Sequence, residues 1–286
     1  MEHAGFSFII AALCALRESS QTLPMPDLIN VILLGIIEGI TEFLPISSTG
    51  HLLIAEQWLG RRSDTFNIVI QAGAMLAVTL IYWRRIVDML FGWRDPANRD
   101  YAGKLALAFG ITAVLGLVVK KFGFQLPESV TPIAWALIIG GVWILIAEAI
   151  AARHPVRDTV SWNVAVWVGV AQVVAGIFPG TSRSAATIFI AMLVGACSRA
   201  TATEFAFLVG IPTMYAASAW SLMKDTSATD SASEWQALLI GFVVSAIVAF
   251  VAVKWLLSYI RTHTFTPFAY YRIALGFLLL FLPFGE

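Results

Sequence analysis

Two acidic residues four positions apart, Glu38 and Glu42, stand inside an otherwise apolar stretch of this 286-residue chain. In a helix, that spacing puts both carboxylates on one face, with Cβ atoms about 5–6 Å apart. Two like charges in an apolar setting are costly, so the pair must share a proton, meet a cation or face a polar cavity. Because oxygen ligands suit a hard divalent cation, both residues are candidate ligands of Mg²⁺ or Ca²⁺. The alternative is an interfacial pair that points at water.

Hydroxyl groups and a histidine follow at once, in PISSTGH at residues 45–51. Ser48 is a candidate nucleophile, and His51 is a candidate base for it or acid for a leaving group. Ser47 and Thr49 are candidate phosphate ligands, because the free N–H groups at a helix start favour anions. The alternative for the serines is helix capping, which Ser performs routinely.

A second polar cluster, PGTSRSAAT at residues 179–187, supplies a cation where the first supplies carboxylates. Arg183 has the planar guanidinium that suits bidentate phosphate binding, and an arginine reaching toward lipid headgroups is the alternative. The hydroxyl residues of this cluster are further candidate phosphate ligands: Thr181, Ser182, Ser184 and Thr187. Together, the two clusters fit phosphoryl transfer from a lipid diphosphate.

The composition places these clusters in a membrane. Hydrophobic residues make up 59% of the chain and charged residues 13%, with a mean hydropathy of +0.82, whereas soluble domains are about half apolar and about a quarter charged. The 18 basic residues equal the 18 acidic ones and are scattered, which excludes nucleic acid as a main partner. Cys14 and Cys197 are too few and too far apart for a disulfide framework or a zinc site, so both are predicted to be packing residues.

The apolar runs predict the helices that position the site. A bilayer core needs about 20 apolar residues of helix, and six runs approach this length: 66–83, 105–119, 132–152, 204–223, 235–257 and 268–284. Two further regions are interrupted by the polar clusters: 28–44 with 51–59, and 162–178 with 185–196. Irregular backbone at membrane depth must be buried in protein or line a wet cavity. We therefore predict an all-α integral membrane protein with six transmembrane helices and two re-entrant half-helix pairs, although each break is also compatible with a surface loop.

The interrupted regions form an internal repeat at a constant offset of 134 residues, which pairs Pro45 with Pro179 and Ser48 with Ser182. An odd number of spans separates the copies, so they enter the membrane from opposite sides. This predicts an inverted repeat, approximately 28–83 and 162–223, with a site near the midplane. Residues 27–286 are expected to form a single membrane domain, preceded by an N-terminal extension, residues 1–26, whose role the sequence does not decide.

The two clusters, EGITEFLPISSTGH at residues 38–51 and PGTSRSAAT at 179–187, resemble the undecaprenyl-diphosphate phosphatase family of the bacitracin-resistance type. The resemblance runs from about residue 28 to the C-terminus and includes QAG at 71–73, WRR at 83–85, EF at 204–205 and YR at 271–272. It implies a bacterial inner-membrane enzyme that hydrolyses undecaprenyl pyrophosphate to undecaprenyl phosphate and inorganic phosphate with a divalent cation. Such an enzyme recycles the carrier lipid of cell-wall synthesis and confers bacitracin resistance.

The resemblance also implies which residues matter: Glu38, Glu42, Ser48, His51 and Arg183. Their division of labour stays open. Ser48 assisted by His51 would give a covalent phosphoenzyme, whereas a water activated by Glu42 or His51 would give direct hydrolysis. The expected partners are a polyprenyl pyrophosphate substrate and membrane lipids, and the sequence does not decide whether the chain forms a homodimer.

The distribution of Lys and Arg predicts the orientation of the chain in the membrane. Lys and Arg are more frequent on the side that holds residues 84–104, so that loop is expected in the cytoplasm and the site open to the periplasm.

The main alternative function is a polyprenyl-phosphate transporter or flippase, since broken helices in inverted repeats are typical of transporters. The carboxylates occur in one copy only, because Gln172 and Gly176 replace them in the other. This asymmetry favours chemistry over alternating access.

Overall fold

The protein is described by a computed structural model over residues 23–122, 130–224 and 231–281. Within these ranges all regular secondary structure is helical, apart from an isolated β-bridge between Arg157 and Cys197. The eleven helices, in chain order, are α2 (Met25–Thr41), α3 (Ser48–Leu59), α4 (Asp64–Ile81), α5 (Trp83–Phe91), α6 (Pro96–Lys121), α7 (Val130–Ala151), α8 (Trp162–Ile177), α9 (Arg183–Gly195), α10 (Arg199–Lys224), α11 (Ala232–Tyr259) and α12 (Thr266–Phe281). The predicted all-α class is confirmed for the described residues.

Five helices are long and apolar enough to cross a membrane, namely α4, α6, α7, α10 and α11. They coincide with five of the six predicted spans, and the chain is therefore a multi-pass membrane protein. The sixth predicted run, 268–284, forms α12, which has 16 residues and is shorter than the roughly 20 that a full crossing needs. The last three residues of that run lie outside the described ranges.

The two interrupted regions each fold as two helices joined by a turn. In the first, α2 ends at Thr41 and α3 begins at Ser48; in the second, α8 ends at Ile177 and α9 begins at Arg183. Proline in both turns removes a backbone donor and clashes with the preceding helical turn, so a helix cannot continue through it. The predicted breaks are thus present, within a few residues of the expected positions.

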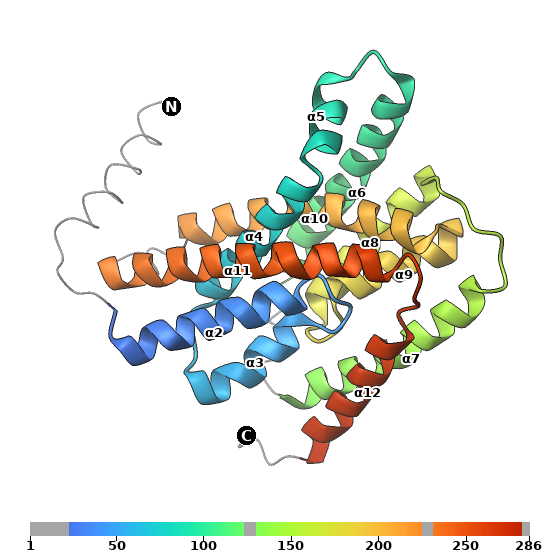
Figure 1. The fold of residues 1–286 in the computed structure, drawn as a ribbon. Coiled ribbons are helices and arrows are strands. Elements are labelled where there is room, and N and C mark those ends of the chain that lie inside the picture. The colour runs from blue at the N-terminus through green and yellow to red at the C-terminus, as the bar shows by residue number, and fades with distance from the viewer. Residues whose placement is uncertain (1–22, 123–129, 225–230, 282–286) are drawn as a thin grey trace.

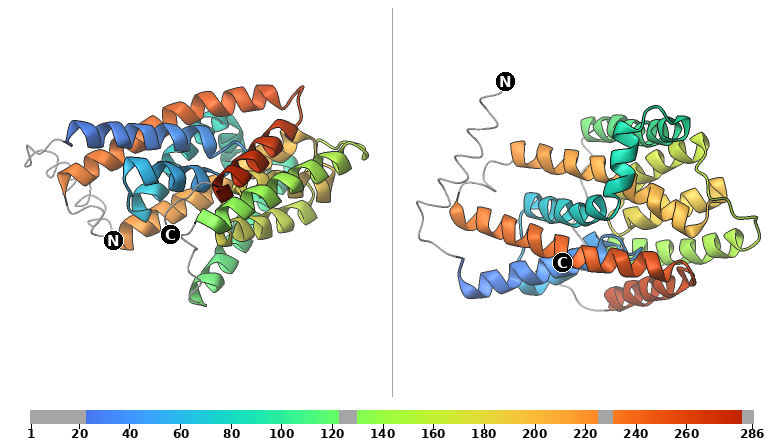
Figure 2. Two further views of the ribbon diagram at one scale, coloured as in Figure 1. Left: turned by 90° about the horizontal axis from the view of Figure 1, so that it is seen from below. Right: turned by 45° about the horizontal axis from the view of Figure 1, so that its top comes forward.

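Helix α11 runs across the molecule and packs against both α2 and α4 (Figures 1 and 2). The backbones approach closely at Gly39, where an added Cβ would lie 2.7 Å from the Ser245 carbonyl oxygen and 2.9 Å from the Ala249 nitrogen. Gly73 of α4 meets the backbone of Phe242 in the same way. Small residues that let backbones touch are typical of membrane helix packing, and here they fix the helix that carries Glu38.

The largest apolar cluster surrounds α9, whose Ile188 and Phe189 are fully buried. This packing fixes the start of α9 and therefore the base of Arg183. Cys197, just beyond α9, is also buried, and burial raises the pKa of its thiol to about 11. It is a packing residue, as predicted, whereas Cys14 and most of the predicted N-terminal extension, residues 1–26, lie outside the described part of the chain.

Candidate active site

The two turns that interrupt the helices share an unusual backbone conformation. Ser47 has φ 73° and Ser182 has φ 68°, a region that residues other than glycine rarely adopt. Each serine is the N-cap of the helix that follows: the Ser47 hydroxyl accepts from the Gly50 N–H and the Ser182 hydroxyl from the Ala185 N–H, both at 3.3 Å. Strained backbone of this kind clusters at functional sites, and the helix capping considered for Ser47 is present.

The matching caps also correct the alignment of the repeat. The constant offset pairs Ser48 with Ser182, whereas the backbone pairs Ser47 with Ser182. The difference arises because the second turn has one more residue between its proline and its cap. After the breaks, the equivalent positions are therefore Ser48 and Arg183, the first residues of α3 and α9.

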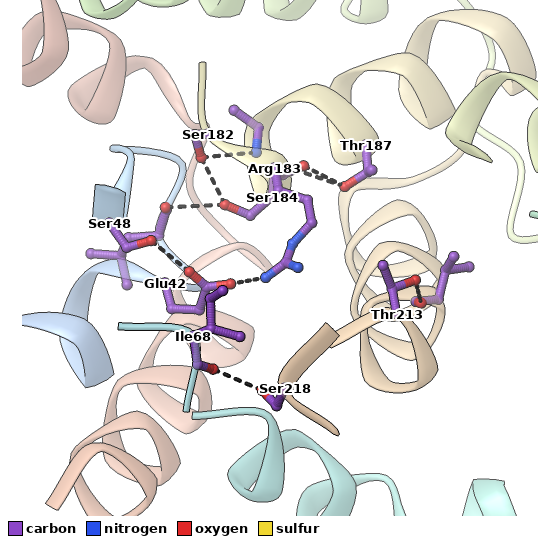
Figure 3. Close-up of polar contacts among 12 residues, drawn as sticks. Glu42, Ser48, Ile68, Ser182, Arg183, Ser184, Thr187, Thr213 and Ser218 are labelled. Atoms are coloured by element: carbon purple, nitrogen blue, oxygen red, sulfur yellow. Dashed lines mark hydrogen bonds and ion pairs between the residues drawn. The ribbon is translucent and has the colours of Figure 1, made fainter. Parts of the chain in front are cut away.

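Ser48 and Arg183 converge on one carboxylate, that of Glu42. The Ser48 hydroxyl donates to Glu42 Oε2 at 2.5 Å, and Arg183 pairs with Glu42 Oε1. Figure 3 shows the Arg183 side chain reaching from the start of α9 to Glu42, with Ser48 on the other side of the same carboxylate. The Glu42 side chain is 5% exposed and that of Arg183 is 21% exposed. Arg183 therefore forms an interior ion pair with Glu42 rather than extending toward lipid headgroups.

A pocket of about 410 Å³ lies against this group, which contributes Glu42, Ser48 and Arg183 to its wall. Residues of α3, α4, α6, α8, α9 and α10 line it. The other polar side chains in the wall are Ser47, Thr49, Gln71, Thr112, Lys120, Gln172, Ser182 and Thr213. The arrangement offers a carboxylate, a hydroxyl and two cations around one cavity, which suits an anionic substrate.

Three predicted phosphate ligands, Ser47, Thr49 and Ser182, line this pocket. Thr49 is exposed to it, whereas the hydroxyls of Ser47 and Ser182 accept the helix-capping bonds described above. The start of each following helix faces the same cavity, so backbone N–H groups and the positive ends of two helix dipoles are available to an anion there.

The other three predicted phosphate ligands are directed elsewhere. The Ser184 hydroxyl donates to the Leu44 carbonyl at 3.1 Å and so connects the second break to the first. The Thr187 hydroxyl donates to the Arg183 carbonyl at 2.8 Å, one turn earlier in its own helix. Thr181 lines a separate apolar groove between α7 and α8. None of these three residues lines the catalytic pocket.

His51 is also turned away from Ser48. Its Nδ1 lies 2.7 Å from the Ser47 carbonyl oxygen, and its Nε2 lies 2.7 Å from the hydroxyl of Tyr271. The two rings stack with centroids 5.7 Å apart. Both ring nitrogens therefore have partners other than Ser48, and the structure pairs Ser48 with Glu42 instead.

Glu38 is fully buried behind Glu42 and does not line the pocket. Among the described residues, neither of its carboxylate oxygens has a hydrogen-bond partner, and its charged neighbours are Glu42 and Arg183. In the described part of the chain, no three His, Cys, Asp or Glu side chains gather closely enough to hold a metal ion by themselves. Mg²⁺ commonly binds through one or two carboxylates together with substrate phosphate oxygens and water. The unpaired Glu38 carboxylate beside Glu42 fits that kind of site.

Arg272 holds the two turns together, a role that the sequence did not reveal. Its side chain is fully buried. The guanidinium donates to five backbone carbonyls at 2.9–3.3 Å, those of Pro45, Ala136, Leu137, Gly180 and Thr181. A Cβ at Gly140 would collide with it. The sequence feature that could have indicated a role for Arg272 is its place inside an apolar run, since charged residues within membrane helices are rare without a role.

The chain is similar in sequence to known proteins of one family. A family model described as "Bacitracin resistance protein BacA" matches residues 31–278. A protein named undecaprenyl-diphosphatase from Rhizobium johnstonii is 70% identical over 255 residues, which cover 89% of this chain and 96% of that protein. One of the same name from Xanthomonas oryzae pv. oryzae is 60% identical over 261 residues, covering 91% and 98% of the two chains.

Proposed function

The chain belongs to the BacA family of bacitracin resistance proteins, and we propose that it hydrolyses undecaprenyl diphosphate to undecaprenyl phosphate and inorganic phosphate. The reaction would recycle the carrier lipid of cell-wall synthesis and so support bacitracin resistance. The names of the relatives supply the substrate. The observation that carries the site assignment is the contact of Glu42 with both Ser48 and Arg183 in the wall of one pocket.

Binding of the diphosphate is assigned to the cations and helix starts around the pocket. The guanidinium has five N–H donors in a planar fork, and Arg183 pairs with Glu42 through one terminal nitrogen. Its remaining donors are in position to hold phosphate oxygens, as are the backbone N–H groups at the starts of α3 and α9. Lys120, which also lines the pocket, adds a second positive charge.

The chemistry is assigned to Ser48, with Glu42 as its base. Glu42 Oε2 takes the hydroxyl proton of Ser48 as the Ser48 oxygen forms a bond to the terminal phosphorus. The bond from that phosphorus to the bridging oxygen breaks, and undecaprenyl phosphate leaves with the electron pair. The products of this step are a phosphoserine and a protonated Glu42, which gives its proton to the leaving phosphate or to water.

A water molecule completes the reaction. Glu42, again ionised, takes a proton from the water as its oxygen attacks the phosphoserine phosphorus. The bond from phosphorus to the Ser48 oxygen breaks, and Glu42 returns the proton to that oxygen. One water is consumed for each inorganic phosphate released, and the enzyme is regenerated. His51 is assigned a positioning role, because its ring nitrogens hold the Ser47 carbonyl and the Tyr271 hydroxyl.

We propose that Glu38 and Glu42 together hold a divalent cation, Mg²⁺ or Ca²⁺, when the diphosphate is bound. The support is the buried, unpaired carboxylate of Glu38, which a cation would stabilise. When bound, the cation would offset negative charge on the phosphate oxygens. In the part of the chain that the structure describes, no third acidic residue joins this pair, so binding is expected to be weak without substrate.

We further propose that the two interrupted regions are re-entrant half-helix pairs of an inverted repeat, in a bacterial inner membrane protein whose site opens to the periplasm. The similar conformations of Ser47 and Ser182 support the repeat, and the distribution of Lys and Arg supports the orientation. A transporter of the lipid phosphate is the less favoured function, because the acidic pair is present in one repeat only.

Phosphate release from undecaprenyl diphosphate in detergent tests the function. Wild-type protein should release phosphate, and Glu42→Gln and Arg183→Ala should each lower kcat/KM by at least about 10²-fold, as expected for loss of a general base or of a charge clamp. Glu56→Gln is the matched control, since Glu56 is equally buried but bonds Asn67 outside the pocket. A folded wild-type protein that releases no phosphate would exclude the enzyme and direct attention to lipid translocation.

A further inference from the structure

Apart from the catalytic pocket, the surface carries an apolar groove of about 510 Å³ between α5, α6 and α10. Figure 1 shows α5 and the first part of α6 projecting from the other helices. Ile86, Leu90 and Trp93 line the groove from α5 and the turn after it, and Leu208 and Ile211 line it from α10. The side chains of Leu90 and Trp93 are more than half exposed. The groove is therefore an open, apolar feature on the surface of a membrane protein.

Polar contacts hold α5 in place beside this groove. Arg85 Nε lies 3.6 Å from Glu204 Oε1 on α10, and the Arg85 guanidinium carbon lies 4.5 Å from the centre of the Tyr101 ring on α6. The Tyr101 hydroxyl donates to Glu204 at 3.4 Å. These contacts fix α5 to both helices, whereas its apolar Ile86 and Leu90 line the groove. A helix with one polar and one apolar face is typical of the membrane–water interface.

The α6 wall of the groove combines small side chains with a cation. Arg99, Ala102 and Ala106 are three or four positions apart, so they lie on one face of α6, and all three line the groove. The two alanines leave space that larger side chains would fill. Arg99 is exposed near the start of α6. The groove thus has an apolar wall and a positive charge toward one end of α6.

The charge of Arg99 is not offset by the acidic residues near it. The Asp95 side chain caps α6, and Asp100 pairs with Lys104. Asp88 lies on α5 but does not line the groove. Over the ranges that the structure describes, Arg99 takes part in no ion pair. Its guanidinium is therefore available to an anionic group.

We propose that this groove binds an anionic phospholipid, with the phosphate group at Arg99 and an acyl chain along the apolar wall. A guanidinium suits phosphate oxygens, and basic pockets between membrane helices are typical sites for anionic headgroups. Trp93 is in keeping with this position, because tryptophan is enriched where headgroups meet the bilayer core. A free phosphate ion would leave the apolar wall uncovered, whereas a phospholipid matches both parts of the groove.

Fluorescence quenching of Trp93 by brominated lipid tests the site in the whole protein. The protein is reconstituted in phosphatidylcholine vesicles that contain either phosphatidylglycerol or phosphatidylcholine with brominated acyl chains, and no substrate is added. Bromine quenches tryptophan on contact. The chain has 10 tryptophans, so the Trp93 signal is the difference between each protein and the same protein carrying Trp93→Phe. That change keeps the position aromatic and apolar.

In the wild-type protein, phosphatidylglycerol should bind at Trp93 in preference to phosphatidylcholine. Arg99→Gln should weaken phosphatidylglycerol binding about fivefold, the effect of one cation near a lipid phosphate, and Arg99→Lys should retain the preference. Ala106→Phe fills the groove and should reduce quenching by both lipids. The matched controls are Arg153→Gln and Ala149→Phe, which lie outside the groove and should behave as wild type. All four substituted positions are exposed, so the variants should fold.

Four results would overturn the lipid site. Equal binding of the two lipids in wild type, or unchanged binding in Arg99→Gln, would show that Arg99 does not select the headgroup. An equal loss in Arg153→Gln would indicate diffuse attraction of anionic lipid to the whole surface. Displacement of phosphatidylglycerol by inorganic phosphate would make the ligand a free anion. Because no substrate is present, these outcomes are independent of whether the protein releases phosphate.

Discussion

Arg272 offers the sharpest test of how the two turns are held together. Its guanidinium is fully buried and donates to backbone carbonyls on both turns and on α7. Arg272→Met keeps an apolar stem of similar length and removes every donor. The carbonyls that lie within α7 retain helical partners, so the loss falls on the turn carbonyls of Pro45, Gly180 and Thr181.

The magnitude follows from these three carbonyls. A buried acceptor left without a partner costs about 1–3 kcal/mol, which gives about 3–9 kcal/mol for the three acceptors together. Typical proteins have only about 5–15 kcal/mol of stability, so Arg272→Met should unfold at a much lower temperature. Arg272→Lys keeps the charge but not the planar fork. It should fold and lose about 10²-fold in kcat, since small displacements of catalytic groups have effects of that size.

Thermal unfolding in detergent and steady-state phosphate release measure both quantities. Arg62→Met is the matched control, because Arg62 pairs with Asp27 away from the pocket, and such partly exposed pairs contribute about 1 kcal/mol or less. Wild-type stability and kcat in Arg272→Met would refute the reasoning. Equal losses in Arg272→Met and Arg62→Met would refute it as well.

Three further predictions concern individual side chains. Glu38→Gln should raise the Mg²⁺ concentration needed for half-maximal activity, and EDTA should abolish wild-type activity; a metal-independent rate would contradict the cation site. His51→Asn should retain more activity than His51→Ala, because an amide N–H can still bond the Ser47 carbonyl, and losses as large as in Ser48→Ala would instead make His51 the base. Thr187→Val should be nearly as active as wild type, because its hydroxyl bonds only helix carbonyls.

The breaks and their polar residues were predictable because their signals are local. Proline with neighbouring serines interrupts an apolar run in a way that sequence alone displays, and a carboxylate or guanidinium inside such a run is rare without a function. The sequence therefore indicates Glu42 and Arg183 as functional residues without showing that they are in contact. The contact between Glu42 and Arg183 depends on how the two copies of the repeat pack against each other. An internal repeat suggests this packing but does not determine it.

The partner of Ser48 was not predictable for a physical reason. His51 is three residues away in the sequence, so it was the nearest base, but the positive φ of Ser47 sets the start of α3 so that Ser48 contacts Glu42. Serine rarely adopts a positive φ, and no pattern of residues in the sequence predicts that conformation at this position. The contacts of Arg272 are also invisible in the sequence, because they join residues 91 to 227 positions away.

A double-mutant cycle tests the central claim, that Glu42 and Ser48 act as one unit. Single-turnover phosphate release from undecaprenyl diphosphate would be measured for wild type, Glu42→Gln, Ser48→Ala and the double variant. If Glu42 acts by activating Ser48, the double variant should be about as slow as the slower single variant, as is found for catalytic residues that act together. If the two losses instead multiply, Glu42 and Ser48 act independently and the proposed serine mechanism is wrong.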